Sequence, residues 1–144
     1  MKIVSFFIYS LLVVASYFSP LISYAETVVI VHPSNSVSEL SQKVVKKLYL
    51  AKSDTFPGGA KATPVDQPEQ SAIRDIFYQK VTGKNPSKIK SYWSKMIFSG
   101  KASPPAILAN DAEVKSWIAA NSNGIGYIDK AGVDASVKVV LTVQ

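Results

Sequence analysis

Apolar residues along this chain form short continuous runs that alternate with stripes of helical spacing. Residues 27–31 are β-branched and apolar without alternation, which predicts a strand that is buried on both faces and central in its sheet. Residues 61–65, 124–128 and 137–143 predict three further strands. Clusters of turn-forming residues bound these runs. The pattern therefore predicts four strands spread along the chain.

Between these strands, apolar residues recur every three or four positions. The spacing predicts helices over residues 40–49, 71–83 and 111–118. A further helix begins after Asn85, which is followed by proline, a favoured first helical residue, and runs to Gly100. Four strands and four helices in this order indicate one compact α/β domain.

The first 25 residues follow a different pattern from the rest. Lys2 precedes a long apolar core, and the segment ends in the small-residue sequence Ser23-Tyr24-Ala25. This order predicts a secretory signal peptide that is cleaved after Ala25. A retained membrane anchor is the alternative, because the apolar core approaches spanning length. Polar residues within the core favour cleavage, so we expect a periplasmic protein whose domain spans residues 26–144.

The number and distribution of charged residues limit the kinds of partner that we expect. The chain of 144 residues has 16 basic and 10 acidic side chains and a formal net charge of +6. The basic residues are dispersed lysines, which form either a solvated surface or a field that attracts anions. Because no strand combines basic and aromatic residues, we expect no nucleic-acid partner.

Catalytic chemistry finds little support in the sequence. The chain contains no cysteine, which excludes disulfides, thiol chemistry and cysteine-based metal sites. His32 is the only histidine, and no phosphate-binding glycine-rich loop is present. We therefore expect a protein without a cofactor or a metal, and not an enzyme.

Polar loops lie where two predicted strands lead into helices. Ser34 and Asn35 belong to the first loop, and Gln67, Gln70 and Ser71 belong to the second. Unpaired N–H groups and the macrodipole make a helix N-terminus attractive to anions. In an open α/β sheet both loops would lie at the carboxyl edge, where ligands usually bind. Helix capping alone explains the same residue types equally well.

Four sequence blocks together carry a resemblance to a known family: "VVIVHPSNSVSELSQKVVKKLYLAK", "PVDQPEQSAIRDIFYQKVTGK", "YWSKMIFSGKASPP" and "GIGYID". In this order they resemble the short periplasmic phosphate-binding-like proteins of the ABC-transporter solute-binding superfamily. The resemblance covers nearly all of residues 26–144. It implies a single three-layer α/β lobe of the type II periplasmic-binding-protein fold, with a mixed, mostly parallel sheet and flanking helices.

The chain departs from this family at the anion-binding loop. The family's D-G-S-G-T cradle falls on residues 69–73, where only Ser71 is retained. The arginine that precedes the cradle is also missing, because Asp66 and Gln67 occupy that region. Arg74, the only arginine, either compensates for this loss or points outward into solvent.

The resemblance implies a binding protein. We expect it to bind phosphate or another small oxyanion weakly, through Ser34, Asn35 and Ser71 with Arg74 as a charge partner. One lobe offers only half of a closed site, so a partner or a second copy would complete it. An ABC permease or another envelope protein is the expected partner. The alternative is a periplasmic interaction or sensory module that retains the fold but not the ligand site.

Overall fold

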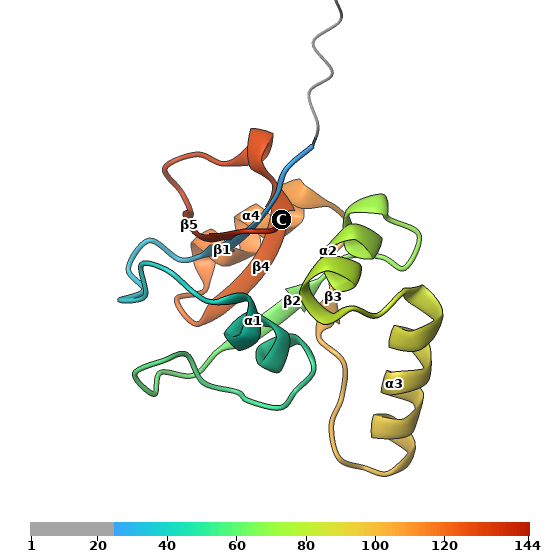
Figure 1. Ribbon diagram of the computed structural model, residues 1–144. Coiled ribbons are helices and arrows are strands. Elements are labelled where there is room, and N and C mark those ends of the chain that lie inside the picture. The colour runs from blue at the N-terminus through green and yellow to red at the C-terminus, as the bar shows by residue number, and fades with distance from the viewer. Residues whose placement is uncertain (1–24) are drawn as a thin grey trace, which may run out of the picture.

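A computed structural model describes residues 25–144 (Figure 1). The predicted signal peptide lies almost entirely outside the described residues, and its cleavage remains a prediction. Within residues 25–144 the chain forms five strands, four α-helices and one 3₁₀ helix: β1 Thr27–Val31, α1 Gln42–Tyr49, β2 Thr63–Asp66, α2 Ala72–Thr82, α3 Pro86–Phe98, β3 Ala106–Ile107, α4 Asp111–Ala120, β4 Gly124–Asp129, η1 Lys130–Gly132 and β5 Lys138–Thr142.

The strand that the sequence did not predict is β3. It has only two residues, which pair in parallel with Val65 and Asp66 of β2. It follows a proline-rich connection that carries no strand periodicity. Its existence depends on the neighbouring strand, which is why the local pattern does not reveal it. The four predicted strands and the four predicted helices are all present, with bounds that shift by a few residues.

The sheet has the order β3-β2-β4-β1-β5 in the described residues. Strand β2 runs parallel to β3 and to β4, whereas β1 runs antiparallel to β4 and to β5. Four strands therefore share one direction and β1 alone is reversed, which confirms a mixed sheet, with two parallel and two antiparallel pairings. All five residues of β1 are buried, as the unbroken apolar run predicts.

The reversed direction of β1 separates the two polar loops. Val31, the last residue of β1, pairs with Ile125 near the start of β4, and Pro64 near the start of β2 pairs with the same residue. The loop after β1 therefore lies at the edge where β2 begins, and the loop after β2 lies at the opposite edge. The expectation that both loops share one carboxyl edge is wrong, because strand direction depends on pairing partners distant in sequence.

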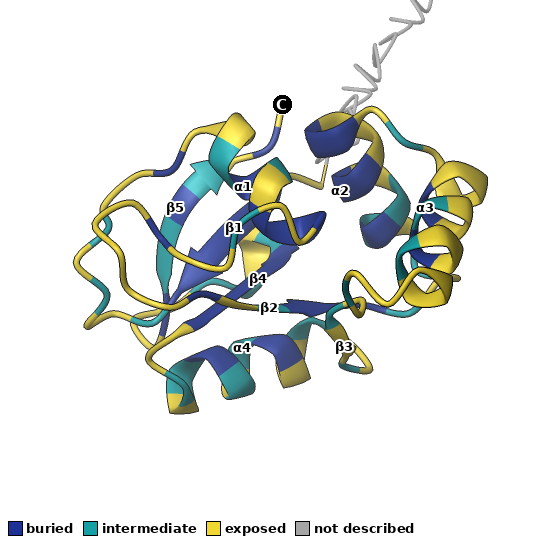
Figure 2. Cartoon of the chain, turned by 90° about the horizontal axis from the view of Figure 1, so that it is seen from below, coloured by how far each residue is buried: buried dark blue, intermediate teal, exposed yellow. Residues whose placement is uncertain are grey.

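Helices cover both faces of the sheet and create three layers (Figure 2). In the described residues, one hydrophobic cluster joins Val29 and Val31 of β1 to helices α1, α2 and α3. The other cluster joins Val28 and Ile30 of β1 to α4. Gly126 permits this second contact, since a Cβ atom there would lie 2.7 Å from Val114 Cγ1 of α4.

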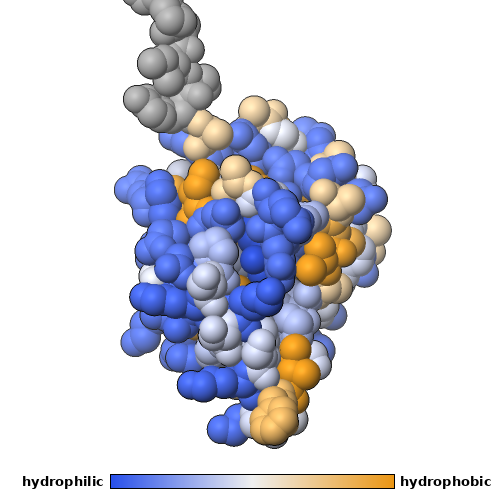
Figure 3. All heavy atoms as spheres, turned by 90° about the vertical axis from the view of Figure 1, so that its right-hand side faces the viewer, coloured by the Kyte–Doolittle hydropathy of each residue, from blue (hydrophilic) through white to orange (hydrophobic). Residues whose placement is uncertain are grey.

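Helix α3 lies at one side of the molecule, where its outward face is exposed (Figures 1 and 2). The surface seen from that side is mostly hydrophilic (Figure 3). Inward, Ile89 and Trp93 of α3 are buried in the larger cluster. No helix within residues 25–144 combines the length and the apolar character needed to cross a bilayer.

Candidate functional site

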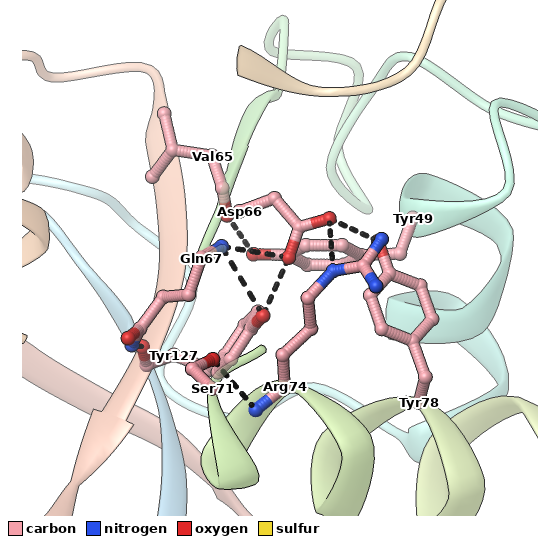
Figure 4. A network of polar contacts seen from close by, with 8 residues as sticks. All are labelled: Tyr49, Val65, Asp66, Gln67, Ser71, Arg74, Tyr78 and Tyr127. Carbon is pink, nitrogen blue, oxygen red and sulfur yellow. Dashed lines mark hydrogen bonds and ion pairs between the residues drawn. The ribbon is translucent and has the colours of Figure 1, made fainter. Parts of the chain in front are cut away.

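A buried carboxylate lies at the end of β2. Asp66 is 2% exposed and the following residue, Gln67, is equally buried. The sequence pattern predicts a polar turn here, but its first residues are buried, with Tyr78 of α2 and Tyr127 of β4 against Asp66 (Figure 4). A carboxylate in such a position is tolerated only when donors surround it.

Within the described part of the chain, four groups donate hydrogen bonds to Asp66 (Figure 4). Oδ1 accepts from the Gln67 backbone N–H at 2.8 Å and from the Tyr127 hydroxyl at 2.5 Å. Oδ2 accepts from the Tyr78 hydroxyl at 2.7 Å and from Arg74 Nε at 3.4 Å. Two hydroxyls, one amide and one guanidinium thus form a cradle around an anion that the chain itself supplies.

Arg74 belongs to this buried cluster. Its side chain leaves the first turn of α2 toward the end of β2, and the residue is 7% exposed. The guanidinium carbon lies 4.9 Å from the centre of the Tyr78 ring, one helical turn further on. Burial has the largest single effect and lowers the pKa of Arg74, but Asp66, Tyr78 and Tyr127 together exceed it, so the pKa is raised. The interpretation that Arg74 points into solvent is wrong, because its face of α2 packs on the sheet.

Three tyrosines surround the pair. Burial, and then the negative charge of Asp66, raise the pKa values of Tyr49, Tyr78 and Tyr127 well above that of a free tyrosine. These hydroxyls are therefore neutral donors at physiological pH. Tyr49 donates to the backbone carbonyls of Val65 and Ile125, at 2.9 and 3.3 Å, which ties α1 to β2 and β4.

Gln67 extends the network to the opposite layer. Its Nε2 donates to Asp111 Oδ1 at 2.7 Å and to the Tyr127 carbonyl at 3.0 Å. The other oxygen of Asp111 accepts from the Asp129 N–H at 2.9 Å. A continuous set of polar contacts thus connects β2, β4 and the start of α4. Our sequence reasoning did not identify Tyr78, Tyr127 or Asp111; the available signal was a carboxylate directly after a buried strand.

Ser71 has the position that the sequence predicts. It is the N-cap of α2, and its Oγ accepts from the Arg74 N–H at 3.4 Å. Its own N–H donates to the Pro68 carbonyl at 2.9 Å. Ser71 is half-buried, whereas Glu69 and Gln70 beside it are exposed. The first turn of α2 is consequently open to solvent next to the buried Asp66 cluster.

Ser34 and Asn35 lie at the other edge of the sheet. The N–H and Oγ of Ser34 contact His32 Nδ1 at 3.0 and 2.7 Å, and Asn35 Oδ1 accepts from the Val37 N–H at 2.9 Å. Helix α1 is capped by Ser41, so neither residue lies at a helix N-terminus. The structure therefore brings Ser71 and Arg74 together but not Ser34 and Asn35 with them. Across residues 25–144, no three histidine, aspartate or glutamate side chains gather closely enough to hold a metal ion.

Solved structures of phosphate transport proteins match this fold. A candidate phosphate ABC transporter substrate-binding protein from Clostridium perfringens, solved with bound phosphate, aligns with a TM-score of 0.66 and 27% identity over 81% of this chain and 44% of its own. An ABC-type phosphate transport receptor from Vibrio cholerae aligns with a TM-score of 0.64 and 17% identity over 81% of this chain and 45% of its own. PstS from Borrelia burgdorferi aligns with a TM-score of 0.59 and 11% identity over 81% of this chain and 46% of its own.

No family model matches the sequence, and no curated protein matches it closely enough to count as a relative. The likeness therefore rests on the fold, with the Clostridium protein as the match of highest identity among those described. The protein has the phosphate-binding-like fold of ABC transporter substrate-binding proteins. It spans less than half the length of the solved structures it matches.

Proposed function

We propose that this protein is an exported solute-binding-like protein, related to the phosphate-binding component of ABC transporters, that binds phosphate or another small anion weakly. The observation that carries the proposal is the 27% identity to a structure with bound phosphate, over 81% of the chain. The proteins it matches are described as substrate-binding proteins and receptors, which supports a binding role and not an enzyme.

The proposed contact is the first turn of α2. Ser71 caps this turn at the end of β2, and the first N–H groups of a helix lack intrahelical partners. The Asp66–Arg74 pair behind it is neutral overall, so it neither strongly attracts nor repels an approaching anion. Weak affinity follows from a half-open site, and an ABC permease, another envelope protein or a second copy would complete it.

Isothermal titration with phosphate, sulfate and acetate tests this proposal. We expect binding at millimolar concentration that Ser71→Ala weakens several-fold. Ser41→Ala is the matched control, because it removes the N-cap serine of a different helix, α1, and should leave binding unchanged. Absence of heat with all three anions at millimolar concentration would refute anion binding.

A second candidate function is favoured by the cradle around Asp66. Arg74, Tyr78, Tyr127 and the Gln67 N–H are already engaged by this internal carboxylate, so they are not free for an external anion. An interaction or sensory module that keeps the fold and has lost the ligand site accounts for this arrangement. Crosslinking in the cell envelope followed by co-purification distinguishes this module from an anion-binding protein. An interaction or sensory module should be recovered with a stable protein partner even when no anion binds.

Export is part of the same proposal. We expect the periplasm to hold a form that begins at Glu26, after removal of residues 1–25. Intact mass measurement of the protein from a periplasmic extract tests this. A protein that keeps residue 1 and sediments with membranes would instead support the retained anchor.

A further inference from the structure

The positive charge of the folded part is concentrated in one segment. Residues 76–110 contain no aspartate or glutamate but hold six lysines: Lys80, Lys84, Lys88, Lys90, Lys95 and Lys101. The remainder of residues 25–144 carries nine basic and ten acidic side chains. None of the six lysines forms an ion pair within the described residues. This segment, which includes α3, is therefore a strongly basic surface on an otherwise balanced protein.

Three of these lysines share one stripe of α3 with an aromatic side chain. Lys84, Lys88, Ser91, Lys95 and Phe98 follow one another at intervals of four and three residues, which places them on one helical face. The stripe starts just before α3 and ends at its last residue. We call these five residues the α3 stripe.

Phe98 is 96% exposed, so packing within this fold does not explain it. Ile97 beside it is 57% exposed, whereas Ile89 and Trp93 on the inward face are buried. Figure 3 shows hydrophobic atoms at the lowest end of the molecule, the level at which α3 ends in Figure 1, within a mainly hydrophilic surface. A large aromatic group therefore projects from the tip of a basic helix.

The lysines frame a shallow groove on the same side. Its volume is about 310 Å³, and it is lined by Lys84, Lys88 and Lys95 with Ser87, Ser91 and Tyr92. Lys84 Nζ lies 5.6 Å from the centre of the Tyr92 ring. Ammonium and hydroxyl donors with no acidic neighbour in the segment suit phosphate groups.

We propose that the α3 stripe is a peripheral docking surface for an anionic phospholipid bilayer. The lysines contact the lipid phosphates, and Phe98 inserts at the boundary between headgroups and acyl chains. A bilayer fits better than an acidic protein because the apolar part is one projecting tip, whereas stable protein interfaces bury roughly 1,200–2,000 Å². This role is independent of anion binding at α2.

Vesicle flotation tests the proposal. Purified protein is mixed with vesicles of phosphatidylcholine alone or of phosphatidylcholine with phosphatidylglycerol, and the ratio of the two affinities is measured. We expect a preference for anionic vesicles that rising salt weakens. The double variant Lys88→Gln/Lys95→Gln should lower the ratio about 25-fold, since each lysine near an anionic surface contributes roughly fivefold. The charge-matched control is Lys43→Gln/Lys47→Gln on the exposed side of α1, which should keep the ratio.

Fluorescence tests the aromatic contact separately. In a Phe98→Trp variant, we expect the emission maximum to move to shorter wavelength with anionic vesicles and to stay unchanged with neutral ones. Equal affinity for both vesicle types, equal losses in the stripe and control variants, or an unmoved emission maximum would each overturn the proposal. Capture of an acidic envelope protein by the stripe, without vesicle binding, would assign the surface to a protein and also overturn it.

Discussion

Arg74 Nε lies 3.4 Å from Oδ2 of Asp66, and both side chains are almost fully buried. The chain thus places its only arginine against a carboxylate at the point where β2 ends and α2 begins. Tyr78, Tyr127 and the Gln67 N–H complete the contacts of that carboxylate. The same donors would suit an external anion, but Asp66 already occupies them.

Breaking the buried pair should destabilise the protein strongly. Arg74→Met leaves Asp66 buried without its charged partner, and we expect a loss of about 3–5 kcal/mol in the free energy of unfolding. Asp66→Asn should also be destabilising, and the double variant should lose less than the sum of the two. Urea unfolding of the original protein, the two single variants and the double variant measures the coupling energy between Asp66 and Arg74.

The exposed pair between Lys115 and Asp134 is the control. Its N–O distance of 2.9 Å is shorter than that of the buried pair. Lys115→Met should nevertheless change stability by less than about 1 kcal/mol, because water screens an exposed pair. Similar losses for Lys115→Met and Arg74→Met would contradict the importance that we assign to burial.

Removing the internal carboxylate should create an anion site. In Asp66→Ala, the donors that Asp66 satisfied remain in place around a space that a small carboxylate fits. We expect formate to raise the urea midpoint of this variant in a concentration-dependent manner, and chloride at equal ionic strength to have no such effect. If formate stabilises the original protein and Asp66→Ala equally, Asp66 does not act as an internal ligand.

Alkaline pH should unfold the protein through its buried tyrosines. Burial raises the folded-state pKa values of Tyr49, Tyr78 and Tyr127 above the ordinary value of 10.0. Their contribution to the free energy of unfolding is therefore complete below pH 10 and is lost as the pH rises further, because the unfolded chain releases these protons first. The slope should approach about 1.4 kcal/mol per pH unit for each tyrosine. Urea midpoints between pH 8 and 11 measure it. Tyr78→Phe should show a shallower slope, and an unchanged slope would speak against this cause.

Phe77 should be far more sensitive to truncation than its neighbour Ile76 in α2. Its ring is fully buried and stacks on Tyr127 with 3.9 Å between centroids and 6° between planes. Phe77→Ala should lower stability by about 3–5 kcal/mol through loss of burial and a cavity. The neighbouring Ile76 is 40% exposed, so Ile76→Ala should have a much smaller effect. Thermal and urea unfolding of both variants provide the comparison, and equal losses would contradict the packing.

The sequence by itself determined four of the five strands and all four α-helices of the described residues, with ends that lie within a few residues of those observed. The unbroken apolar run of β1 predicts burial on both faces, because each face of a central strand contacts a helical layer. Asn85 and Ser71 cap helices as their residue types indicate, since capping depends only on the next three residues. The block order also indicated the phosphate-binding-like fold.

Only the tertiary structure decided the direction of β1, the pairing of β3 and the composition of the Asp66 cluster. Tyr127 lies 61 residues from Asp66 in sequence, and Tyr78 and Arg74 come from a different element. Their meeting depends on strand register and on the face that α2 presents to the sheet. Local sequence patterns predict neither the register nor this face. A polar residue after a strand therefore looked like a turn, although the fold buries it among donors from distant segments.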